Sequence, residues 1–400
     1  MNSQLRRLKP LLVCLACMLA IFTAWTLTLG IRSGIIGRTD FRSMYSAGYL
    51  ERTHPTQLYS LDAQLQIQNR LISKGDFSLP YFHPGCEALL FVPFSFLPYP
   101  AAYLAFIAFN IVLIALCVLA GMRLFSDPIP YLQPRPGLVV LLFLPVWVAV
   151  FQGQDSILFL LLLILAWKQM DDDRPFHAGL LLGLAMFKFQ IVLPLACFLA
   201  LRKGGRLVRG FLLGSTAVVA LSFAASPQSP ASFVRLVHNA ALAGGSLNAP
   251  GHQSYISPLR MANFRGLLFA FVGRHLSAHA LLALTLAVSV LFLALVAILL
   301  RRVGNDRLAF SAALMACLLT SYHLYPHDLT PLLLPIVAIA AAPLPWKRVL
   351  PIALCLAPVL LLVFTGADSL FLITIPILLA IGAILFAPQS QLASPDGVLK

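Results

Sequence analysis

An acidic side chain follows the first long apolar run of this chain, in the sequence Thr39-Asp40-Phe41. Only 14 of the 400 residues are acidic, so the surroundings of each can be inspected in turn. A carboxylate held beside a substrate hydroxyl can act as a general base. If the chain performs carboxylate chemistry outside a membrane, Asp40 is the leading candidate for the residue that does it.

Two other acids resemble Asp40, because each begins an apolar run and has polar neighbours. They lie in the segments Phe151-Gln152-Gly153-Gln154-Asp155-Ser156 and Ser321-Tyr322-His323-Leu324-Tyr325-Pro326-His327-Asp328. Capping of a helix by a short polar side chain is the alternative explanation, and it carries more weight for Asp155 and Asp328 than for Asp40. Glu51 and Asp62 fall on the polar faces of predicted helices, where solvation explains them.

Cationic and aromatic side chains are predicted to collect on the same side of the membrane as these acids. Arginines and histidines at a membrane boundary suit a phosphate, because charge-assisted hydrogen bonds to its oxygens offset the cost of keeping cations near lipid. Snorkelling toward lipid headgroups is the alternative for each one taken singly. The cationic residues and histidines concerned are Lys188, Arg260, Arg265, His323 and His327. Tyr81 and His83, in the segment Tyr81-Phe82-His83-Pro84, are expected on the same side.

The composition predicts the elements that hold these residues. Hydrophobic residues make up 60% of the chain and charged residues 10%, with a mean hydropathy of +0.89. Such a chain cannot form a water-soluble globule, and in lipid a helix satisfies its own backbone hydrogen bonds. We therefore expect an all-α polytopic membrane protein with about 10 to 12 transmembrane helices, each needing roughly 20 apolar residues.

The distribution of lysine and arginine predicts the orientation, because short cytoplasmic loops retain these residues. Residues 202–209, 301–307 and 347–348 then mark the cytoplasmic side, and residues 31–80 lie outside the cell. Helical spacing of apolar residues predicts two amphipathic helices on the membrane surface within that outer loop, the first capped by Thr39 or Asp40. The net charge of +14 is explained by this topology and by attraction to anionic lipids.

Two later segments are harder to place. Residues 81–97 are short and broken by prolines, so they either cross as a short tilted helix or dip into the membrane and return. Residues 177–201 contain Lys188 in the middle of an apolar run, where a buried charge would be costly. We expect two short helices that turn at the outer face and expose Lys188 to water or to an anion.

Several function classes lack their usual sequence support. The chain contains no HExxH, GxxxxGK[ST], GxGxxG or GxSxG segment, and the seven cysteines lie almost entirely within apolar runs. The DxD-type acidic run, Asp171-Asp172-Asp173, falls on the predicted cytoplasmic side. We expect no cofactor, no metal and no nucleic-acid partner.

The order of several short segments resembles glycosyltransferase family 87 over roughly residues 36 to 345. They are Asp40-Phe41, the Tyr59 stretch, Tyr81-Phe82-His83-Pro84, Gly153-Gln154, Ala178-Gly179 through Lys188, Asn263-Phe264-Arg265-Gly266 and residues 321–328. His83 and Gly85 depart from a tyrosine-proline-proline sequence common in that family, and Asp155 replaces a common asparagine. These departures concern fine geometry and sugar preference.

The resemblance implies a GT-C membrane glycosyltransferase that takes a sugar from a polyprenyl-phosphate donor on the extracytoplasmic side of the plasma membrane. Asp40 would be the catalytic base of an inverting transfer, with a mannose-like hexose as the expected sugar. The acceptor would be a glycolipid, a glycan or a protein. The implied donor-phosphate and substrate contacts are Lys188, Arg260, Arg265, His323, His327, His83, Tyr81, Gln154, Asp155 and Asp328.

Two other functions fit part of the pattern. A secondary transporter or lipid flippase would also have broken helices and membrane charges, but it often shows two related halves and places its charges near the midplane. A polysaccharide polymerase or ligase would share the lipid-linked donor but carry its large outer loop later in the chain. We expect a single domain over residues 1–386 and a flexible tail over residues 387–400.

Overall fold

The computed structural model describes residues 3–73, 79–124, 136–226, 229–242, 246–249, 252–255, 257–342, 344, 346 and 349–387. The α-helices are α1 (Ser3–Ile35), α2 (Phe41–Thr53), α3 (Leu61–Leu71), α4 (Gly85–Phe91), α5 (Tyr99–Leu124), α6 (Pro136–Leu142), α7 (Leu144–Gln152), α8 (Ser156–Asp171), α9 (Pro175–Leu184), α10 (Phe189–Lys203), α11 (Gly205–Ala225), α12 (Ser229–Leu242), α13 (Phe264–Val272), α14 (Ala278–Leu300), α15 (Asp306–Thr320), α16 (Leu333–Ala341), α17 (Val349–Phe364) and α18 (Thr374–Leu385). The 3₁₀ helices are η1 (Pro55–Gln57), η2 (Pro93–Phe96), η3 (Met186–Lys188), η4 (Pro258–Arg260), η5 (Gly273–His275), η6 (Pro326–Leu332) and η7 (Ala367–Ile373).

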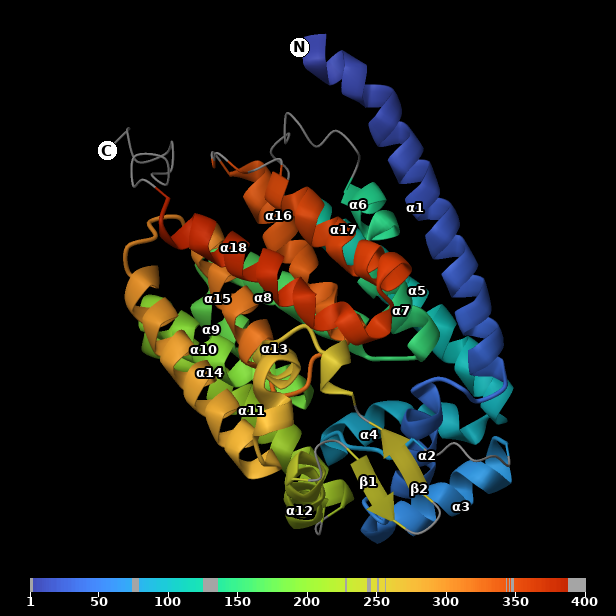
Figure 1. The fold of residues 1–400 in the computed structure, drawn as a ribbon. Coiled ribbons are helices and arrows are strands. Elements are labelled where there is room, and N and C mark those ends of the chain that lie inside the picture. Colours follow the sequence, from blue (N-terminus) through green and yellow to red (C-terminus); the bar gives the residue numbers. More distant parts are fainter. Residues whose placement is uncertain are drawn as a thin grey trace.

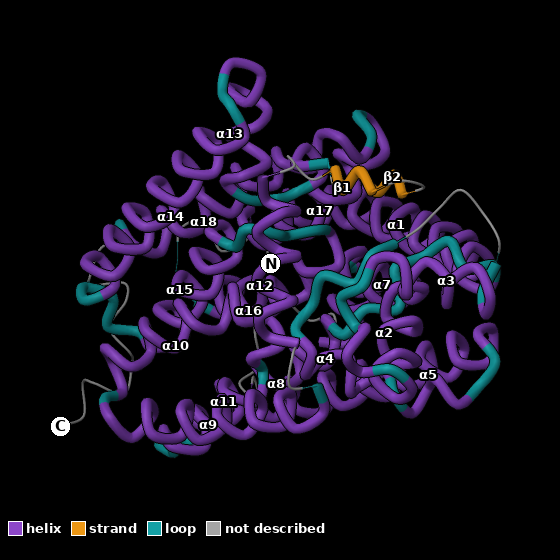
Figure 2. The backbone as a smooth tube through the Cα atoms, turned by 90° about the horizontal axis from the view of Figure 1, so that it is seen from below, coloured by secondary structure: helices purple, strands orange, loops and turns teal. Residues whose placement is uncertain are grey.

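Helices dominate the chain, as predicted, with one departure. Strands β1 (Ser246–Ala249) and β2 (His252–Tyr255) form a short antiparallel pair. Figure 2 shows this pair beside the helices. The predicted tail lies almost wholly outside the described residues.

Among the described residues, five helices are long and apolar enough to cross a membrane, and a bent pair makes a sixth possible span. The five are Cys17–Ile35, Tyr99–Met122, Gly205–Ala225, Ala278–Leu300 and Ala367–Leu385. Other long apolar stretches are divided into shorter helices. For example, α6 and α7 are separated at Phe143. The polytopic membrane protein is confirmed, and the number of 10 to 12 crossings stays a prediction.

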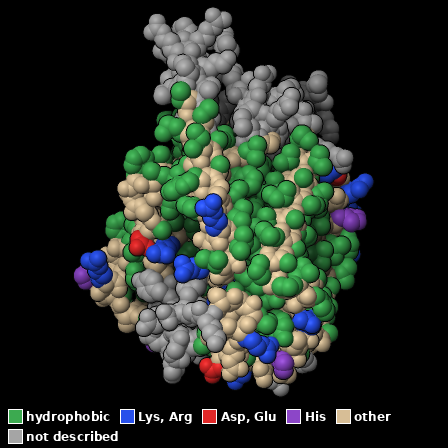
Figure 3. Space-filling view, turned by 90° about the vertical axis from the view of Figure 1, so that its right-hand side faces the viewer, with side chains coloured by type: hydrophobic (Ala, Val, Ile, Leu, Met, Phe, Trp, Pro, Cys, Tyr) green, Lys and Arg blue, Asp and Glu red, His purple; other side chains and the backbone are tan. Residues whose placement is uncertain are grey.

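The long helices and the short ones occupy different parts of the molecule. Figure 1 shows the start of α1 together with α6 and α16 toward one end of the molecule, and α2, α3, α4, α12 and the strand pair at the other. Helices α1 and α14 run along opposite edges. Figure 3 shows one face covered largely by hydrophobic side chains. Large apolar residues such as Trp25 and Leu291 are 60% and 70% exposed, as expected for lipid contact.

The loops rich in lysine and arginine meet at one end of the helix bundle. Arg202 and Lys203, at the end of α10, contact Asp306 at 2.6 and 2.7 Å. Arg307, at the start of α15, contacts Asp171, at the end of α8, at 3.0 Å. Three loops that the sequence places on one side of the membrane are therefore neighbours. Lys347 and Arg348 lie outside the described residues.

Helices α9 and α11 touch through their backbones. A Cβ atom on Gly183 would lie 2.6 Å from the backbone oxygen of Phe211, and one on Gly214 would lie 2.5 Å from that of Leu180. Glycines allow this close approach, which is a common way to pair helices in membranes. Helix α9 ends at a 66° bend before α10, so this contact also fixes the position of η3 at the bend.

The first helix of the segment predicted to form the outer loop is buried, whereas it was predicted to lie on the membrane surface. Helix α2 does not lie on a surface, because Phe41 through Gly48 are all buried within the protein. Glu51 was expected to be solvated, and this expectation is wrong: it is 7% exposed, and neither carboxylate oxygen has a hydrogen-bond partner among the described residues. Burial raises its pKa to about 7. Residues 81–97 form only α4 and η2, too short to cross a membrane as a helix.

Candidate active site

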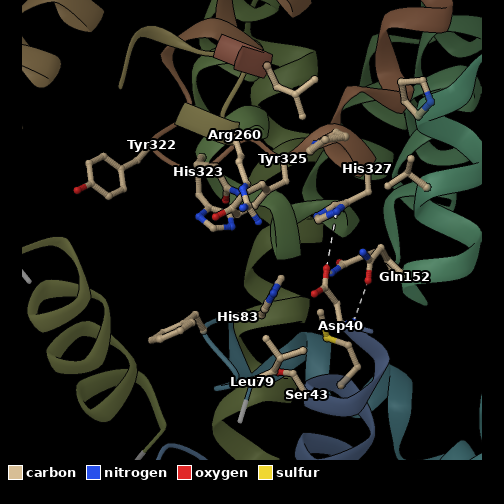
Figure 4. A pocket seen from close by; sticks show the side chains of 18 of the residues that line it. Asp40, Ser43, Leu79, His83, Gln152, Arg260, Tyr322, His323, Tyr325 and His327 are labelled. Atoms are coloured by element: carbon tan, nitrogen blue, oxygen red, sulfur yellow. Dashed lines mark hydrogen bonds and ion pairs between the residues drawn. The ribbon is translucent and has the colours of Figure 1, made fainter. Parts of the chain in front are cut away.

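A cavity of about 560 Å³ lies between the helix ends and the segment of residues 40–84. Its polar lining comes from six separate parts of the chain, and its apolar lining includes side chains of α7, α17 and η7. Figure 4 shows His327 and Gln152 next to Asp40, with Arg260, His323 and Tyr325 farther along the cavity. The ionisable residues on its surface are Asp40, His83, Arg260, Arg265, His323 and His327.

Asp40 occupies the N-cap position of α2, as predicted, but its side chain makes no capping hydrogen bond. The carboxylate accepts a hydrogen bond at Oδ2 from Gln154 Nε2, at 2.9 Å. The backbone N–H of Asp40 donates to Gln152 Oε1 at 3.1 Å. The side chain is 32% exposed, so the acid is oriented by two glutamines and is still accessible from the cavity.

Gly153 makes this arrangement of the two glutamines possible. Its φ of 70° is in the left-handed region, and it ends α7. A Cβ atom there would lie 2.5 Å from Cβ of Phe41. A glycine is therefore needed to bring the turn between α7 and α8 against the start of α2.

His327 lies between two carboxylates. Its Nδ1 atom is 3.8 Å from Asp40 Oδ2, and its Nε2 atom is 3.3 Å from Asp328 Oδ2. Asp328 also receives the backbone N–H of Tyr325 at 3.2 Å. The capping role considered for Asp328 is therefore real, but the same carboxylate has further partners.

Lys188 is one of those partners, and it is buried. Its Nζ atom lies 3.1 Å from Asp328 Oδ1 and 3.1 Å from Asp155 Oδ1. The exposed fractions of Lys188 and Asp155 are 2% and 1%. The expectation that Lys188 faces water or an anion is wrong, because two carboxylates offset the cost of burying its charge.

His83 contacts a further buried acid, Glu87. The Nδ1 atom of His83 lies 2.9 Å from Glu87 Oε1, and Glu87 is 2% exposed. Burial raises the pKa of Glu87 to about 7 and lowers the pKa of His83 to about 4. His83 is therefore neutral near pH 7 and faces the cavity as a hydrogen-bonding group. Tyr81 lies behind it, fully buried, and donates to the backbone oxygen of Pro84 at 2.9 Å.

A second group of residues brings cations to the cavity. Arg265 is 5% exposed, its guanidinium lies 4.0 Å above the ring of Tyr322, and no carboxylate contacts it in the described part of the chain. Arg260 contacts Asp368 at 2.7 Å and is half exposed. Burial lowers the pKa of His323 to about 3, so this ring is also neutral near pH 7.

One asparagine joins the two segments that carry this second group. Asn263 caps α13 by accepting the backbone N–H of Gly266 at 2.9 Å. Its side-chain amide donates to the backbone oxygen of Ser321 at 2.7 Å. The start of α13, with Arg265, is thereby fixed to the segment that carries Tyr322 and His323.

Residues 81–326 match the sequence profile of glycosyltransferase family 87, which is more than half of the chain. The protein belongs to glycosyltransferase family 87. It is therefore a membrane glycosyltransferase that uses a sugar donor and an acceptor. No curated protein and no solved structure matches the chain significantly. The matched range contains most of the cavity residues, but it begins after Asp40.

In this glycosyltransferase, the predicted site residues divide into two sets. Those on the cavity surface are Asp40, His83, Gln154, Arg260, Arg265, His323 and His327. Those that lie behind it are Tyr81, Asp155, Lys188 and Asp328, each buried by other protein groups. Sequence reasoning missed Gln152 and Tyr325, which also line the cavity. The sequence signal for them was their position inside the polar segments that contain Asp155 (Gln152) and Asp328 (Tyr325).

Proposed function

We propose that this enzyme transfers a hexose from a polyprenyl-phosphate donor to an acceptor hydroxyl, with inversion at the anomeric carbon and Asp40 as the general base. The observation that carries the proposal is one cavity with an accessible carboxylate, Asp40, and a buried arginine without a carboxylate partner in the described chain, Arg265. The reaction needs both: a base for the acceptor and a cationic site for the leaving phosphate.

The environment of Arg265 supports a phosphate as its ligand. A buried charge is unfavourable unless it is paired, and the interactions of the guanidinium with described residues are a cation–π contact with Tyr322 and a hydrogen bond to the sulfur of Met261, with no ion pair. A phosphate would supply the missing negative charge in bidentate geometry. Arg260 would add a second cation, and the neutral rings of His83 and His323 would add hydrogen bonds.

The apolar part of the cavity supports a lipid-linked donor. Leu144, Val148 and Phe151 of α7 face it together with Pro358 and Leu362 of α17. An isoprenoid chain could lie against these side chains while its phosphate and sugar stay in the polar part. The clustered cationic loops at the other end of the bundle favour a cavity on the extracytoplasmic side of the plasma membrane.

The proposed reaction is a single displacement. Asp40 removes the proton from an acceptor hydroxyl as that oxygen attacks the anomeric carbon. The bond from the anomeric carbon to the phosphate oxygen breaks, and the electron pair leaves with polyprenyl phosphate. Gln152 and Gln154 hold Asp40 in place. A mannose-like hexose and a glycolipid, glycan or protein acceptor are the expected substrates from the family.

The decisive experiment measures transfer of labelled sugar from a panel of polyprenyl-phosphate sugars to membrane-extracted acceptors by the purified protein in lipid nanodiscs. Asp40→Asn should lower transfer by at least about 100-fold, the usual scale of general-base catalysis. Asp62→Asn is the matched control, because Asp62 is exposed on α3 and does not line the cavity. Equal activity of Asp40→Asn and wild type would remove Asp40 from the mechanism. Absence of transfer from every donor, with substrate flux in liposomes, would favour a transporter.

A further inference from the structure

The position of His327 suggests a role other than binding the donor phosphate. Its ring is the group on the cavity surface that lies between Asp40 and the buried Asp328. Its side chain is only 7% exposed. A ring held this closely beside the proposed base is placed to exchange a proton with it.

The partners of Asp328 determine which nitrogen of His327 carries the proton. Besides the backbone N–H of Tyr325, the Asp328 carboxylate receives Lys188 Nζ at 3.1 Å and Ser156 Oγ at 3.4 Å. Surrounded by donors and a fixed positive charge, Asp328 is held as a carboxylate. Its carboxylate oxygen Oδ2 lies 3.3 Å from Nε2 of His327 and favours a proton on that nitrogen, which would leave the lone pair of Nδ1 on the side of Asp40.

The separation of 3.8 Å between Nδ1 and Asp40 Oδ2 agrees with this tautomer. A lone pair and an ionised carboxylate do not form a hydrogen bond, so the two atoms stay apart while neither carries a proton. Once Asp40 is protonated, its O–H can donate to Nδ1. The pair then forms a hydrogen bond that only exists after the acceptor has lost its proton.

We propose that His327 takes from Asp40 the proton that Asp40 removes from the acceptor hydroxyl, so that the two residues form a relay. This proposal depends on the transfer reaction proposed above. The O–H bond of protonated Asp40 breaks and an N–H bond forms at Nδ1 of His327, which becomes an imidazolium. The imidazolium lies between the carboxylates of Asp40 and Asp328, and it later releases the proton to the water of the cavity.

Lys188 and Asp155 are positioning residues for this relay. Lys188 lies against both Asp328 and Asp155, so the carboxylate next to Nε2 of His327 is held in place from behind the cavity. Both lie behind the cavity and contact no substrate position. Among the described residues, the charged and titratable groups around His327 include Asp40, Asp328 and Lys188, with His83, Glu87 and His323 near enough to interact.

Chemical rescue tests the relay in the nanodisc assay. His327→Ala should lower kcat by about 100-fold while the KM for the donor changes by less than about threefold. Added imidazole should raise the kcat of this variant at least about tenfold, in proportion to the neutral imidazole present. His323→Ala is the matched control, because it removes the same ring from the same cavity at a place that does not contact Asp40, and imidazole should not raise its rate.

Three results would overturn the relay: wild-type kcat in His327→Ala, no response of that variant to imidazole, or a loss confined to the donor KM, which would assign His327 to phosphate binding. If His327→Ala does not fold, His327→Gln replaces it, since an amide cannot take the proton; a wild-type kcat there would also overturn the proposal. Asp40→Asn in the same assay distinguishes failure of the relay from failure of the proposed transfer reaction. If the transfer reaction is wrong, wild type is inactive or Asp40→Asn is active. If only the relay is wrong, wild type is active and Asp40→Asn is inactive.

Discussion

The cavity is bordered by two buried cations in opposite situations. Lys188 is enclosed by the carboxylates of Asp155 and Asp328. Arg265 is nearly as buried, yet its contacts in the described chain are an aromatic ring and a thioether. The first cation has all its charge compensated by the protein, so it stabilises the fold. The second has a charge that a ligand must compensate, so it is the one suited to binding the donor.

Removing Lys188 should give the largest effect on stability. Lys188→Met leaves Asp155 and Asp328 buried without their cation and should lower the free energy of unfolding by about 3–5 kcal/mol. Thermal unfolding followed by tryptophan fluorescence in nanodiscs measures this. Lys168→Met is the control, because Lys168 pairs with Asp172 on the surface and should cost less than about 1 kcal/mol. Equal effects of the two substitutions would contradict the structural role of Lys188.

Removing Arg265 should affect transfer and spare the fold. Arg265→Met should lower kcat/KM by about 100- to 1,000-fold, because the leaving phosphate loses its cation, with little change in unfolding temperature. Arg42→Met is the informative comparison, since Arg42 is also buried but donates hydrogen bonds to Gln68 and Ser73. It should destabilise the protein. If Arg265→Met unfolds as readily as Arg42→Met, the distinction between a ligand-binding and a structural buried cation fails.

The pH dependence of stability should show a smaller effect, from the buried acid Glu87 next to His83. Burial raises the pKa of Glu87 from 4.5 to about 7, so the folded state favours the protonated acid. Its contribution to stability is complete below about pH 4.5 and is lost as the pH rises through 7. Glu87→Gln should flatten this slope and stabilise the protein above pH 7 by about 1–3 kcal/mol. An unchanged slope would show that Glu87 does not titrate in this range.

The location of the site could be predicted from the sequence because its signals are local. Asp40 follows an apolar run, and the two polar segments around Asp155 and Asp328 interrupt other apolar runs, so hydropathy places all three at helix boundaries. The pairing of Lys188 with Asp328 could not be predicted, because 140 residues separate them and no local pattern relates them. Lys188 was accordingly assigned to the solvent side of its bend instead of the interior.

The burial of α2 shows a second limit of local patterns. Helical spacing of apolar residues predicted a helix with one solvent-exposed face. That face is covered by protein: Ser46 donates to the backbone oxygen of Ser43 and Arg42 donates to Gln68, whereas Glu51 is buried without a hydrogen-bond partner in the described chain. Amphipathic spacing reports where polar side chains lie on a helix, and it does not report whether water or protein satisfies them.

The relation between Asp40 and His327 has a consequence for how the protein is made. The catalytic cavity unites a residue near the start of the chain with one 287 positions later. During synthesis, Lys188 follows Asp155 into the membrane, but its second partner, Asp328, emerges much later. We therefore expect the nascent chain to hold Lys188 with a single carboxylate partner, Asp155, until the last third is translated, and to gain activity only then.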